Sequence, residues 1–281
     1  MYKILKKEEI GSNVYSFNVY APDIAKNAKA GQFVIFRIDD KGERVPLTIA
    51  GTDIKEGTIR IIFQIVGKST TQLSLLNEEN LIKDLAGPLG RPTEIKKYGL
   101  VVAVAGGVGA AEILPVIKEL KKAGNKIVTI IGARCKDLII LKDELKQASN
   151  ELLFATNDGS CGMNGFVTDV LKEVIVREKG DLVYAIGPVP MMKAVSDLTK
   201  EKDIETLVSL NPIMLDGTGM CGACRVEVDN KIRFTCVDGP EFNAHLVDWE
   251  GLSLRLGLYK NFEKESLDNF SYNRECKCHR K

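Results

Sequence analysis

Hydrophobic and polar positions follow two different patterns along the chain. In the first hundred residues they alternate or form short β-rich runs between Gly and Asp turns, as at 14–19, 33–38 and 59–66. Such runs predict short strands. About six of them, without an obvious amphipathic helix, predict a small antiparallel β-barrel, because closure of the barrel removes exposed strand edges.

The second pattern begins with a continuous apolar run at 100–105, which is typical of a parallel strand buried on both faces. Helices are expected at 110–123, 165–178 and 190–199, and further strands at 126–131, 152–155, 182–186 and 205–210. Strands that alternate with helices predict βαβ units in an α/β doubly wound parallel sheet. Pro115 is expected near the start of its helix, where a proline ring costs least.

These patterns divide the chain of 281 residues into four parts. We expect a β-barrel at 1–97, an α/β domain at 98–210, a small loop domain at 211–245 and a helical tail at 246–281. Apolar residues at 245–249 and 252–258 are spaced for a short amphipathic helix. This helix either closes the loop domain or docks a partner.

Composition and charge exclude several classes of protein. With 44% apolar and 27% charged residues, the chain is that of a folded globular protein. A net charge of +1 gives no reason to expect nucleic acid or anionic lipid as a partner. No run approaches the roughly 18 apolar residues that span a membrane, and the first residues lack the apolar core of a secretory signal. We therefore expect a cytoplasmic protein.

The cysteines point to metal or redox chemistry. There are seven, so they do not all pair within one chain. Cys221, Cys224 and Cys236 lie together, and Cys276 and Cys278 lie near the end. In a cytosolic chain, clustered cysteines indicate a metal or redox site more than a disulfide framework.

From Asp216 the ligand-type residues have the spacing D-x4-C-x2-C-x11-C, whereas plant-type [2Fe–2S] ferredoxins have C-x4-C-x2-C and a distant fourth cysteine. Gly217, Gly219 and Gly222 allow the backbone to wrap closely around a cluster and to donate N–H groups to it. A carboxylate can ligate iron, although it is harder than a thiolate. The predicted ligands of a [2Fe–2S] cluster are Asp216, Cys221, Cys224 and Cys236.

Other interpretations of the cysteines stay open. A C-x2-C pair with a third cysteine is also a structural zinc pattern, although zinc knuckles seldom need three glycines in one loop. Cys276 or Cys278 can replace Asp216 as the fourth ligand, or belong to an exposed end of the chain. Cys135 and Cys161 have no clustered neighbours and are expected to be small core or loop residues.

Three further motifs suggest nucleotide binding. Gly106, Gly107, Val108 and Gly109 follow a buried strand and open a helix, where a pyrophosphate can approach backbone N–H groups. The spacing is not G-x-G-x-x-G, so close packing explains the glycines equally well. Upstream, Arg44 to Thr48 read R-V-P-L-T, and the run at 67–71 reads G-K-S-T-T. Taken alone, each of these is often only a polar strand end.

The order of the motifs resembles the ferredoxin–NADP reductase superfamily. With the cysteine loop added, residues 1–245 resemble its branch that contains the electron-transfer subunit of type B dihydroorotate dehydrogenase. Asp216, the stretch at 185–192 and the stretch at 238–242 are similar to the small (alpha) subunits of NADH-dependent reduced ferredoxin:NADP oxidoreductase. The fold class implied is a β-barrel FAD domain, an α/β nucleotide domain and a small C-terminal [2Fe–2S] loop domain.

The resemblance implies which residues bind FAD. Arg44 would lie on the FAD phosphates, Thr48 near the isoalloxazine ring, and the run at 67–71 over the pyrophosphate. The cofactor-binding positions implied in this half of the chain are Arg44, Pro46, Leu47, Thr48, Ile65, Gly67, Ser69, Thr70 and Thr71.

The resemblance also implies a site for NAD(H). Its pyrophosphate would lie on the glycine turn, its adenosine ribose near Arg134, and its nicotinamide between the run at 157–160 and Gly187. The positions implied are Gly106, Gly107, Val108, Gly109, Ala133, Arg134, Asn157, Asp158, Gly159, Gly187, Pro188 and Met191. Arg134 can also contact a 2′-phosphate, and the preference for NAD over NADP rests on the resemblance. Ile186 stands where many members of the superfamily have a cysteine. Hydride transfer from nicotinamide to flavin needs stacking and orientation of the two rings more than an acid–base residue, so we assign no catalytic residue.

By this resemblance the chain passes electrons between NADH, FAD and its cluster to a larger subunit. That partner would carry a second flavin and further iron–sulfur clusters, resemble the small subunit of glutamate synthase, and perform electron bifurcation with ferredoxin and NADPH in a heterodimer. Three alternatives remain. The first is the electron-transfer subunit of dihydroorotate dehydrogenase, which Asp216 disfavours because that family has four cysteines at the cluster. The others are a stand-alone ferredoxin reductase and a zinc-bearing adaptor without enzymatic activity.

Overall fold

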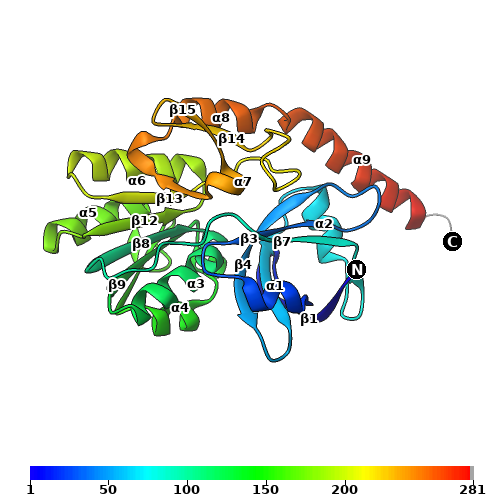
Figure 1. Ribbon diagram of the computed structural model, residues 1–281, viewed down its shortest axis with the longest axis horizontal. Coiled ribbons are helices and arrows are strands. Elements are labelled where there is room, and N and C mark those ends of the chain that lie inside the picture. Colours follow the sequence, from blue (N-terminus) through cyan, green and yellow to red (C-terminus); the bar gives the residue numbers. More distant parts are fainter. Residues whose placement is uncertain (279–281) are drawn as a thin grey trace.

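The computed structural model describes the backbone of residues 1–278 and the side chains of residues 1–270. The N-terminal strands form one body, the parallel sheet forms a second beside it, and the C-terminal elements lie across both (Figure 1). No helix in the part described here is long and apolar enough to cross a membrane.

The N-terminal body is a nearly closed antiparallel barrel, as the alternating pattern predicts. Its sheet has the order β6-β1-β2-β5-β4-β3-β7. The strands are β1 (Tyr2–Gly11), β2 (Val14–Tyr20), β3 (Phe33–Arg37), β4 (Val45–Asp53), β5 (Thr58–Gln64), β6 (Leu81–Ile82) and β7 (Asp84–Leu89). Alternate residues such as Phe17, Val19, Ile59, Ile61 and Phe63 are fully buried, because successive side chains of a strand point to opposite faces.

The prediction that this region lacks helices is wrong. The structure adds α1 (Pro22–Asn27) and α2 (Lys68–Ser74). Neither helix is long enough to show a helical repeat of apolar residues, so the pattern of hydrophobicity does not reveal them. α2 starts in the G-K-S-T-T run, where the hydroxyl oxygen of Thr70 accepts a hydrogen bond from the backbone N–H of Gly67 (3.1 Å).

The second body is a doubly wound parallel sheet, which confirms the predicted class. Its order is β11-β10-β9-β8-β12-β13-β16. The strands are β8 (Leu100–Gly106), β9 (Lys126–Ala133), β10 (Glu151–Thr156), β11 (Met163–Asn164), β12 (Leu182–Ile186), β13 (Thr206–Ser209) and β16 (Glu241–Asn243). Neighbouring strands are parallel except β16, which pairs antiparallel with β13. The segment that bears the cysteines thus supplies the last strand of the nucleotide sheet.

Helices cover both faces of this sheet, and each face packs against a different part of the molecule. The helices are α3 (Gly109–Lys122), α4 (Lys142–Ala148), α5 (Val167–Arg177) and α6 (Val189–Glu201), with a short 3-10 helix η1 (Lys136–Leu138). The face with α3 and α4 shares its core with Val14, Ala50 and Ile62 of the barrel. The face with α5 and α6 shares its core with Val226 and Trp249 of the C-terminal region.

Pro115 does not lie where we expected it. α3 begins at Gly109, so Pro115 lies inside the helix, beyond its first turn. A proline there removes one backbone hydrogen bond and crowds the preceding turn. The helix nevertheless continues past Pro115, because Leu114 and Val116 on either side of it are fully buried and their packing outweighs this cost.

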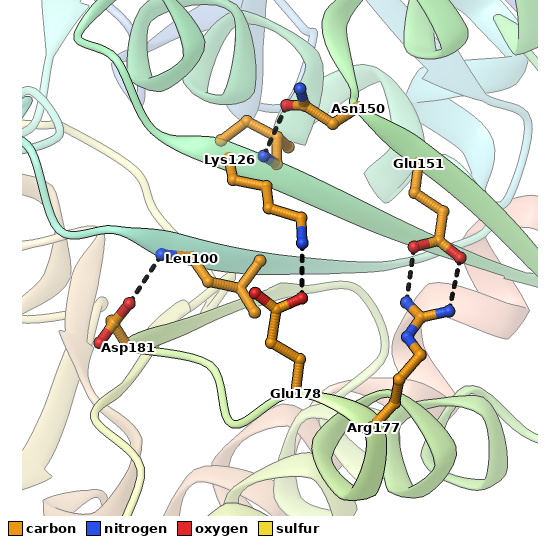
Figure 2. A network of polar contacts seen from close by, with 8 residues as sticks. Leu100, Lys126, Asn150, Glu151, Arg177, Glu178 and Asp181 are labelled. Carbon is orange, nitrogen blue, oxygen red and sulfur yellow. Dashed lines mark hydrogen bonds and ion pairs between the residues drawn. The ribbon is translucent and has the colours of Figure 1, made fainter.

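Polar contacts connect the amino ends of the parallel strands to neighbouring segments (Figure 2). Asp181 accepts a hydrogen bond from the backbone N–H of Leu100 (2.7 Å), which joins the starts of β12 and β8. Arg177 makes a two-point contact with Glu151 at the start of β10. Because these contacts lie at the amino ends of the strands, the carboxyl ends are left free for the glycine turn and its neighbours.

The C-terminal region begins with a small hairpin and ends in two helices. Its elements are β14 (Arg225–Val228), β15 (Lys231–Phe234), α7 (Thr235–Asp238), the 3-10 helix η2 (Ala244–Leu246), α8 (Trp249–Gly257) and α9 (Lys260–Cys278). α8 corresponds to the predicted amphipathic helix, and α9 follows it within the part of the chain expected to be a helical tail. α9 extends beside α2 of the barrel (Figure 1). The side chains of Cys276 and Cys278 lie outside the described residues, so their suggested role as ligands stays a prediction.

Trp249 anchors this region, which gives the first testable prediction. Its side chain is 8% exposed, and its indole N–H donates to the carbonyl of Ala244 (3.1 Å). Trp249→Ala should lower the free energy of unfolding by about 3 kcal/mol, because a large buried side chain leaves a cavity. Leu254→Ala on the same helix, at a side chain 74% exposed, is the control and should change it by less than about 0.5 kcal/mol. Equal effects of the two substitutions in urea titrations would contradict this packing.

Candidate functional site

The cysteine loop lies between β13 and β14 and is shaped by Asp216. One carboxylate oxygen of Asp216 accepts from the backbone N–H of Thr218 and the other from that of Cys221, both at 2.9 Å. Gly217, Gly219 and Gly222 have φ of +78°, +83° and +68°, a backbone region that L side chains rarely adopt. The glycines and the aspartate therefore determine the shape of the loop together.

The predicted ligands form two pairs. Cys224 and Cys236 are 1% and 2% exposed, and the backbone N–H of Cys236 points to the sulfur of Cys224 (3.4 Å). Cys221 is exposed and lies beside Asp216. A [2Fe–2S] cluster takes two protein ligands on each iron. The arrangement fits a [2Fe–2S] cluster, which these two pairs of residues would hold together.

Two further observations bear on the fit of a cluster. Among the residues that the structure describes, no group of three His, Cys, Asp or Glu side chains gathers closely enough to hold one metal ion, so a mononuclear zinc site is not preformed. Beside Cys236, the buried hydroxyl oxygen of Thr235 has no hydrogen-bond partner within the described chain. A cluster sulfide at this place would supply one.

The buried thiol of Cys236 holds its proton unless a cation lies beside it. Burial, and after it the neighbouring Cys224, raise the pKa of Cys236 to about 12. A thiolate is therefore costly at this position unless a positive charge stabilises it, which a bound iron does.

The glycine turn combines close packing with an open face. A Cβ on Gly109 would lie 2.6 Å from the carbonyl oxygen of Ile186, and one on Gly106 would lie 2.6 Å from the sulfur of Met191. Gly107, in contrast, has φ of +57° and nothing within 4 Å of its Cβ position. Two of the three glycines thus allow helix, strand and loop to meet, and Gly107 leaves the backbone open to a ligand.

A cavity of about 360 Å³ at the carboxyl ends of the strands brings together most of the predicted NAD(H) residues. Those that line it are Gly106, Gly107, Val108, Ala133, Arg134, Asn157, Pro188 and Met191. Gly187 packs against the glycine turn. Asp158 holds its own turn, because its carboxylate accepts from the hydroxyl (2.6 Å) and backbone N–H (3.0 Å) of Ser160; these bonds lower its pKa. Gln64 and the exposed Phe166 also line the cavity and were missed.

A second, larger space adjoins the cysteine loop. Arg44 and Pro46 line a cavity of about 900 Å³ together with Cys221 and Tyr259. The predicted phosphate run lines a neighbouring cavity of about 480 Å³, with Gly67, Ser69 and Thr70 on one side and α9 on the other. Glu43 and Val45 line both cavities, so the two lie side by side. The wall formed by α9 was not predicted, because its sequence carries no motif.

Leu47, Thr48 and Ile65 do not line these cavities. The hydroxyl groups of Thr70 and Thr71 hold the turn at Gly67. Thr48, at the barrel edge, instead makes a hydrogen bond with Glu112 of α3.

Two acids at the junction of the domains could not be recognised from the sequence. Burial raises the pKa of Glu112 to about 7, and the hydrogen bond with Thr48 opposes this only partly. Nearby, the hydroxyl of Tyr184 donates to Glu241 Oε1 (2.6 Å), and that of Thr93 donates to the same oxygen (2.5 Å). Burial raises the pKa of Glu241 as well. A lone Glu in a helical sequence gives no sign of its burial, so only the fold reveals these groups.

Family models match two parts of the chain. Residues 211–248 match the iron-sulfur cluster binding domain of dihydroorotate dehydrogenase B. Residues 103–197 match the oxidoreductase NAD-binding domain. The first match covers the cysteine loop with its glycines, and the second covers the glycine turn and the cavity at the strand ends.

Related proteins match over nearly the full length. A dihydroorotate dehydrogenase B (NAD(+)) electron transfer subunit homolog of Thermotoga maritima is 49% identical over 95% of both chains. The dihydroorotate dehydrogenase B (NAD(+)) electron transfer subunit of Desulforamulus reducens is 33% identical over 88% of this chain and 97% of its own length.

Solved structures agree with these relatives. A structure of NADH-dependent reduced ferredoxin-NADP oxidoreductase, described for its flavin-based electron bifurcation, is 48% identical with a TM-score of 0.91 and covers 96% of this chain and 98% of its own. Phthalate dioxygenase reductase shares the fold at 18% identity, with a TM-score of 0.58 over 81% of this chain and 85% of its own.

The raised pKa of Glu112 gives a prediction about stability. Because Glu112 holds its proton more tightly in the folded chain than its ordinary pKa of 4.5 allows, stability should fall as the pH rises from 4.5 to about 7 and then level off. Glu112→Gln removes this loss. The difference in free energy of unfolding between variant and wild type should therefore grow in favour of the variant by about 3 kcal/mol between pH 4 and pH 8.

Urea titrations of the flavin-free protein across this pH range measure the effect. Glu173→Gln, at an exposed site on α5, is the control and should show no such trend. A constant difference between Glu112→Gln and wild type at all pH values would show that Glu112 has an ordinary pKa.

Proposed function

We propose a function in electron transfer for this chain, which belongs to the family of dihydroorotate dehydrogenase B electron-transfer subunits and their homologues. It is a flavoprotein oxidoreductase subunit of the ferredoxin–NADP reductase type, with FAD, NAD(H) and a [2Fe–2S] cluster as its cofactors. It moves electrons between NAD(H) and a larger partner subunit, and the cluster is the exit on the partner's side.

One observation carries this proposal most directly: Arg44, expected at the FAD phosphates, and Cys221 of the cluster loop line the same cavity. The glycine turn lies at the carboxyl edge of the neighbouring sheet, across the junction from the barrel. FAD is the group that accepts a hydride and gives up single electrons, which an iron–sulfur cluster can accept. A nucleotide, a flavin and a cluster can thus lie in sequence along the junction.

The residues of the chain orient these groups. The open backbone at Gly107 receives the nicotinamide nucleotide's pyrophosphate at the start of α3. Ile186 ends β12 beside this turn, is 3% exposed and offers no acid or base. The site therefore acts by positioning the donor against the acceptor.

We propose Asp216, Cys221, Cys224 and Cys236 as the cluster ligands. Cys221 is exposed and Asp216 is half-buried, whereas Cys224 and Cys236 face the apolar core formed with Phe33 and Ile35. A cluster held by these four residues would be accessible to a partner's electron acceptor on the side of Cys221. This suits transfer to a larger subunit with flavin and further iron–sulfur clusters, and we infer that electron bifurcation with ferredoxin and NADPH takes place there, in the cytoplasm.

The second candidate is the electron-transfer role in dihydroorotate dehydrogenase B. The match of residues 211–248 to the iron-sulfur domain of that enzyme supports it. Affinity purification from the native cell separates the two candidates, because this one requires a dihydroorotate dehydrogenase as the stable partner.

Reconstitution tests the electron path. The chain, supplied anaerobically with FAD, iron and sulfide, should lose its flavin colour on addition of NADH. NADPH should act more slowly at equal concentration, by the NAD(H) preference that the resemblance implies. Failure of both nucleotides to reduce the flavin would refute the proposed function.

Substitution of Asp216 tests the ligand set. Asp216→Cys should retain two irons per chain with a visible spectrum of four-thiolate type, because a thiolate is a softer ligand. Asp216→Ala should lose most of the iron, whereas Asp229→Ala, in the exposed turn after β14, should keep it. Full iron content in Asp216→Ala, together with its loss in a Cys276→Ser/Cys278→Ser variant, would place the fourth ligand in the tail.

A further inference from the structure

The C-terminal helix α9 forms a wall that no family match covers. The match to the iron-sulfur cluster binding domain ends at residue 248, and the match to the NAD-binding domain ends at residue 197. α9 begins at Lys260 and lies beside α2 of the barrel (Figure 1). It lines both cavities that contain residues expected to bind FAD. Its side chains therefore face these cavities from the side opposite to the motifs.

We propose that Lys260 and Lys264 of α9 bind the diphosphate of FAD from the wall opposite Gly67 and Ser69, so that the C-terminal helix closes the dinucleotide site. This inference rests on the proposed function, because it takes FAD as the ligand of the two cavities. It adds phosphate-binding residues from a segment in which neither the motifs nor the family matches place any.

One face of α9 carries the side chains that line the cavities. Residues three or four positions apart lie on the same side of a helix. Lys260, Lys264 and Leu267 follow this spacing and line the smaller cavity, together with Gly67. The adjoining edge of the helix, with Phe262, lines the larger cavity. A basic edge of α9 thus lies over the G-K-S-T-T run, and an aromatic side chain lies over the neighbouring space.

The two lysines are not held in ion pairs with any acid of the described chain. The helical spacing would allow Lys260 to pair with Glu263 and Lys264 to pair with Asp268. Neither pair forms among the described residues, and Lys68 on the facing wall has no acidic partner there either. Three cationic side chains that line one cavity therefore keep their charges available to an anion.

The two cavities concentrate positive charge in a chain whose net charge is only +1. Six basic side chains line them, against the two acids Glu43 and Glu263. Part of the Glu43 carboxylate is occupied, because it accepts a hydrogen bond from the hydroxyl of Ser69. A diphosphate would offset the excess of positive charge, and lysine is a common partner of phosphate groups.

The facing wall leaves room for such a ligand. A Cβ on Gly67 would have nothing within 4 Å, so the backbone there is open to the cavity. The cavities of about 480 and 900 Å³ meet at Glu43 and Val45. A drug-sized ligand fills about 300–1,000 Å³, so a longer dinucleotide needs both spaces. A dinucleotide that spans them passes beneath α9 and brings its diphosphate to the two lysines.

α9 has few buried side chains of its own, so a ligand can stabilise it. From residue 258 to residue 265 every side chain is exposed, and Ser266 and Leu267 are half-buried. A helix that buries so little apolar surface is marginal in water. A ligand held between α9 and the barrel binds only the closed arrangement, and it therefore shifts the helix toward that arrangement.

Binding of FAD to the flavin-free, full-length protein tests the two lysines. Quenching of FAD fluorescence gives the Kd. Lys260→Gln/Lys264→Gln should raise this Kd by at least about tenfold, because contacts between a charged donor and phosphate are lost. The Kd of the variant should also depend less on salt, since salt screens exposed charges. Lys142→Gln/Lys146→Gln removes two exposed lysines with the same spacing on α4, and this control should bind FAD as the wild type does.

Two further measurements separate a contact with the ligand from a change in the fold. Chymotrypsin cleaves after exposed aromatic residues such as Tyr259 and Phe262, and FAD should slow this cleavage in the wild type by at least about tenfold. Lys260→Arg/Lys264→Arg keeps both charges and should restore the Kd for FAD to within about threefold. The affinity for NADH should be unchanged in both variants, because the cavity at the glycine turn includes no residue of α9.

Each other outcome overturns the inference. Wild-type affinity for FAD in Lys260→Gln/Lys264→Gln would remove the role of α9 and leave the proposed function standing. Equal losses of affinity in the Arg and Gln variants would show that the lysines act only through the fold of the helix. A wild-type protein that binds no FAD would overturn both this inference and the proposed function.

Discussion

The carboxylate of Glu241 joins the three parts of the chain at one point. It comes from β16 in the segment that carries the cluster loop, and accepts hydrogen bonds from Tyr184 of the nucleotide sheet and Thr93 of the linker after the barrel. The barrel's Gly31 approaches so closely that a Cβ there would lie 2.7 Å from the same carboxylate oxygen. Electron transfer between bound groups depends on fixed distances, and this contact, with β16 paired to β13, fixes the domains relative to one another.

Several polar side chains also gather at this junction. The parts of the chain that would hold the flavin and the cluster meet where Glu112, Thr48, Tyr184 and Glu241 lie. Away from this junction the two faces of the parallel sheet are filled with aliphatic side chains such as Val102, Val104 and Ile117.

Periodicity revealed the barrel, the parallel sheet and its longer helices, because these elements bury one face or both over many residues. It missed α1, α2 and α4, which are too short for a clear repeat, and it did not show how far inside α3 Pro115 lies. Motifs found the glycine turn and the cluster loop. They did not find Glu112, Glu241 or the wall formed by α9, since the role of these residues comes from contacts between segments distant in the sequence.

We propose that electrons from NADH reach a [2Fe–2S] cluster within this chain. Low-temperature EPR of the reconstituted protein, reduced anaerobically by NADH alone, would detect this transfer. We expect the signal of a singly reduced [2Fe–2S] cluster, which is absent before NADH is added and also absent from Cys224→Ser. Bleaching of the flavin by NADH with no such signal, in a protein whose cluster dithionite can reduce, would contradict it.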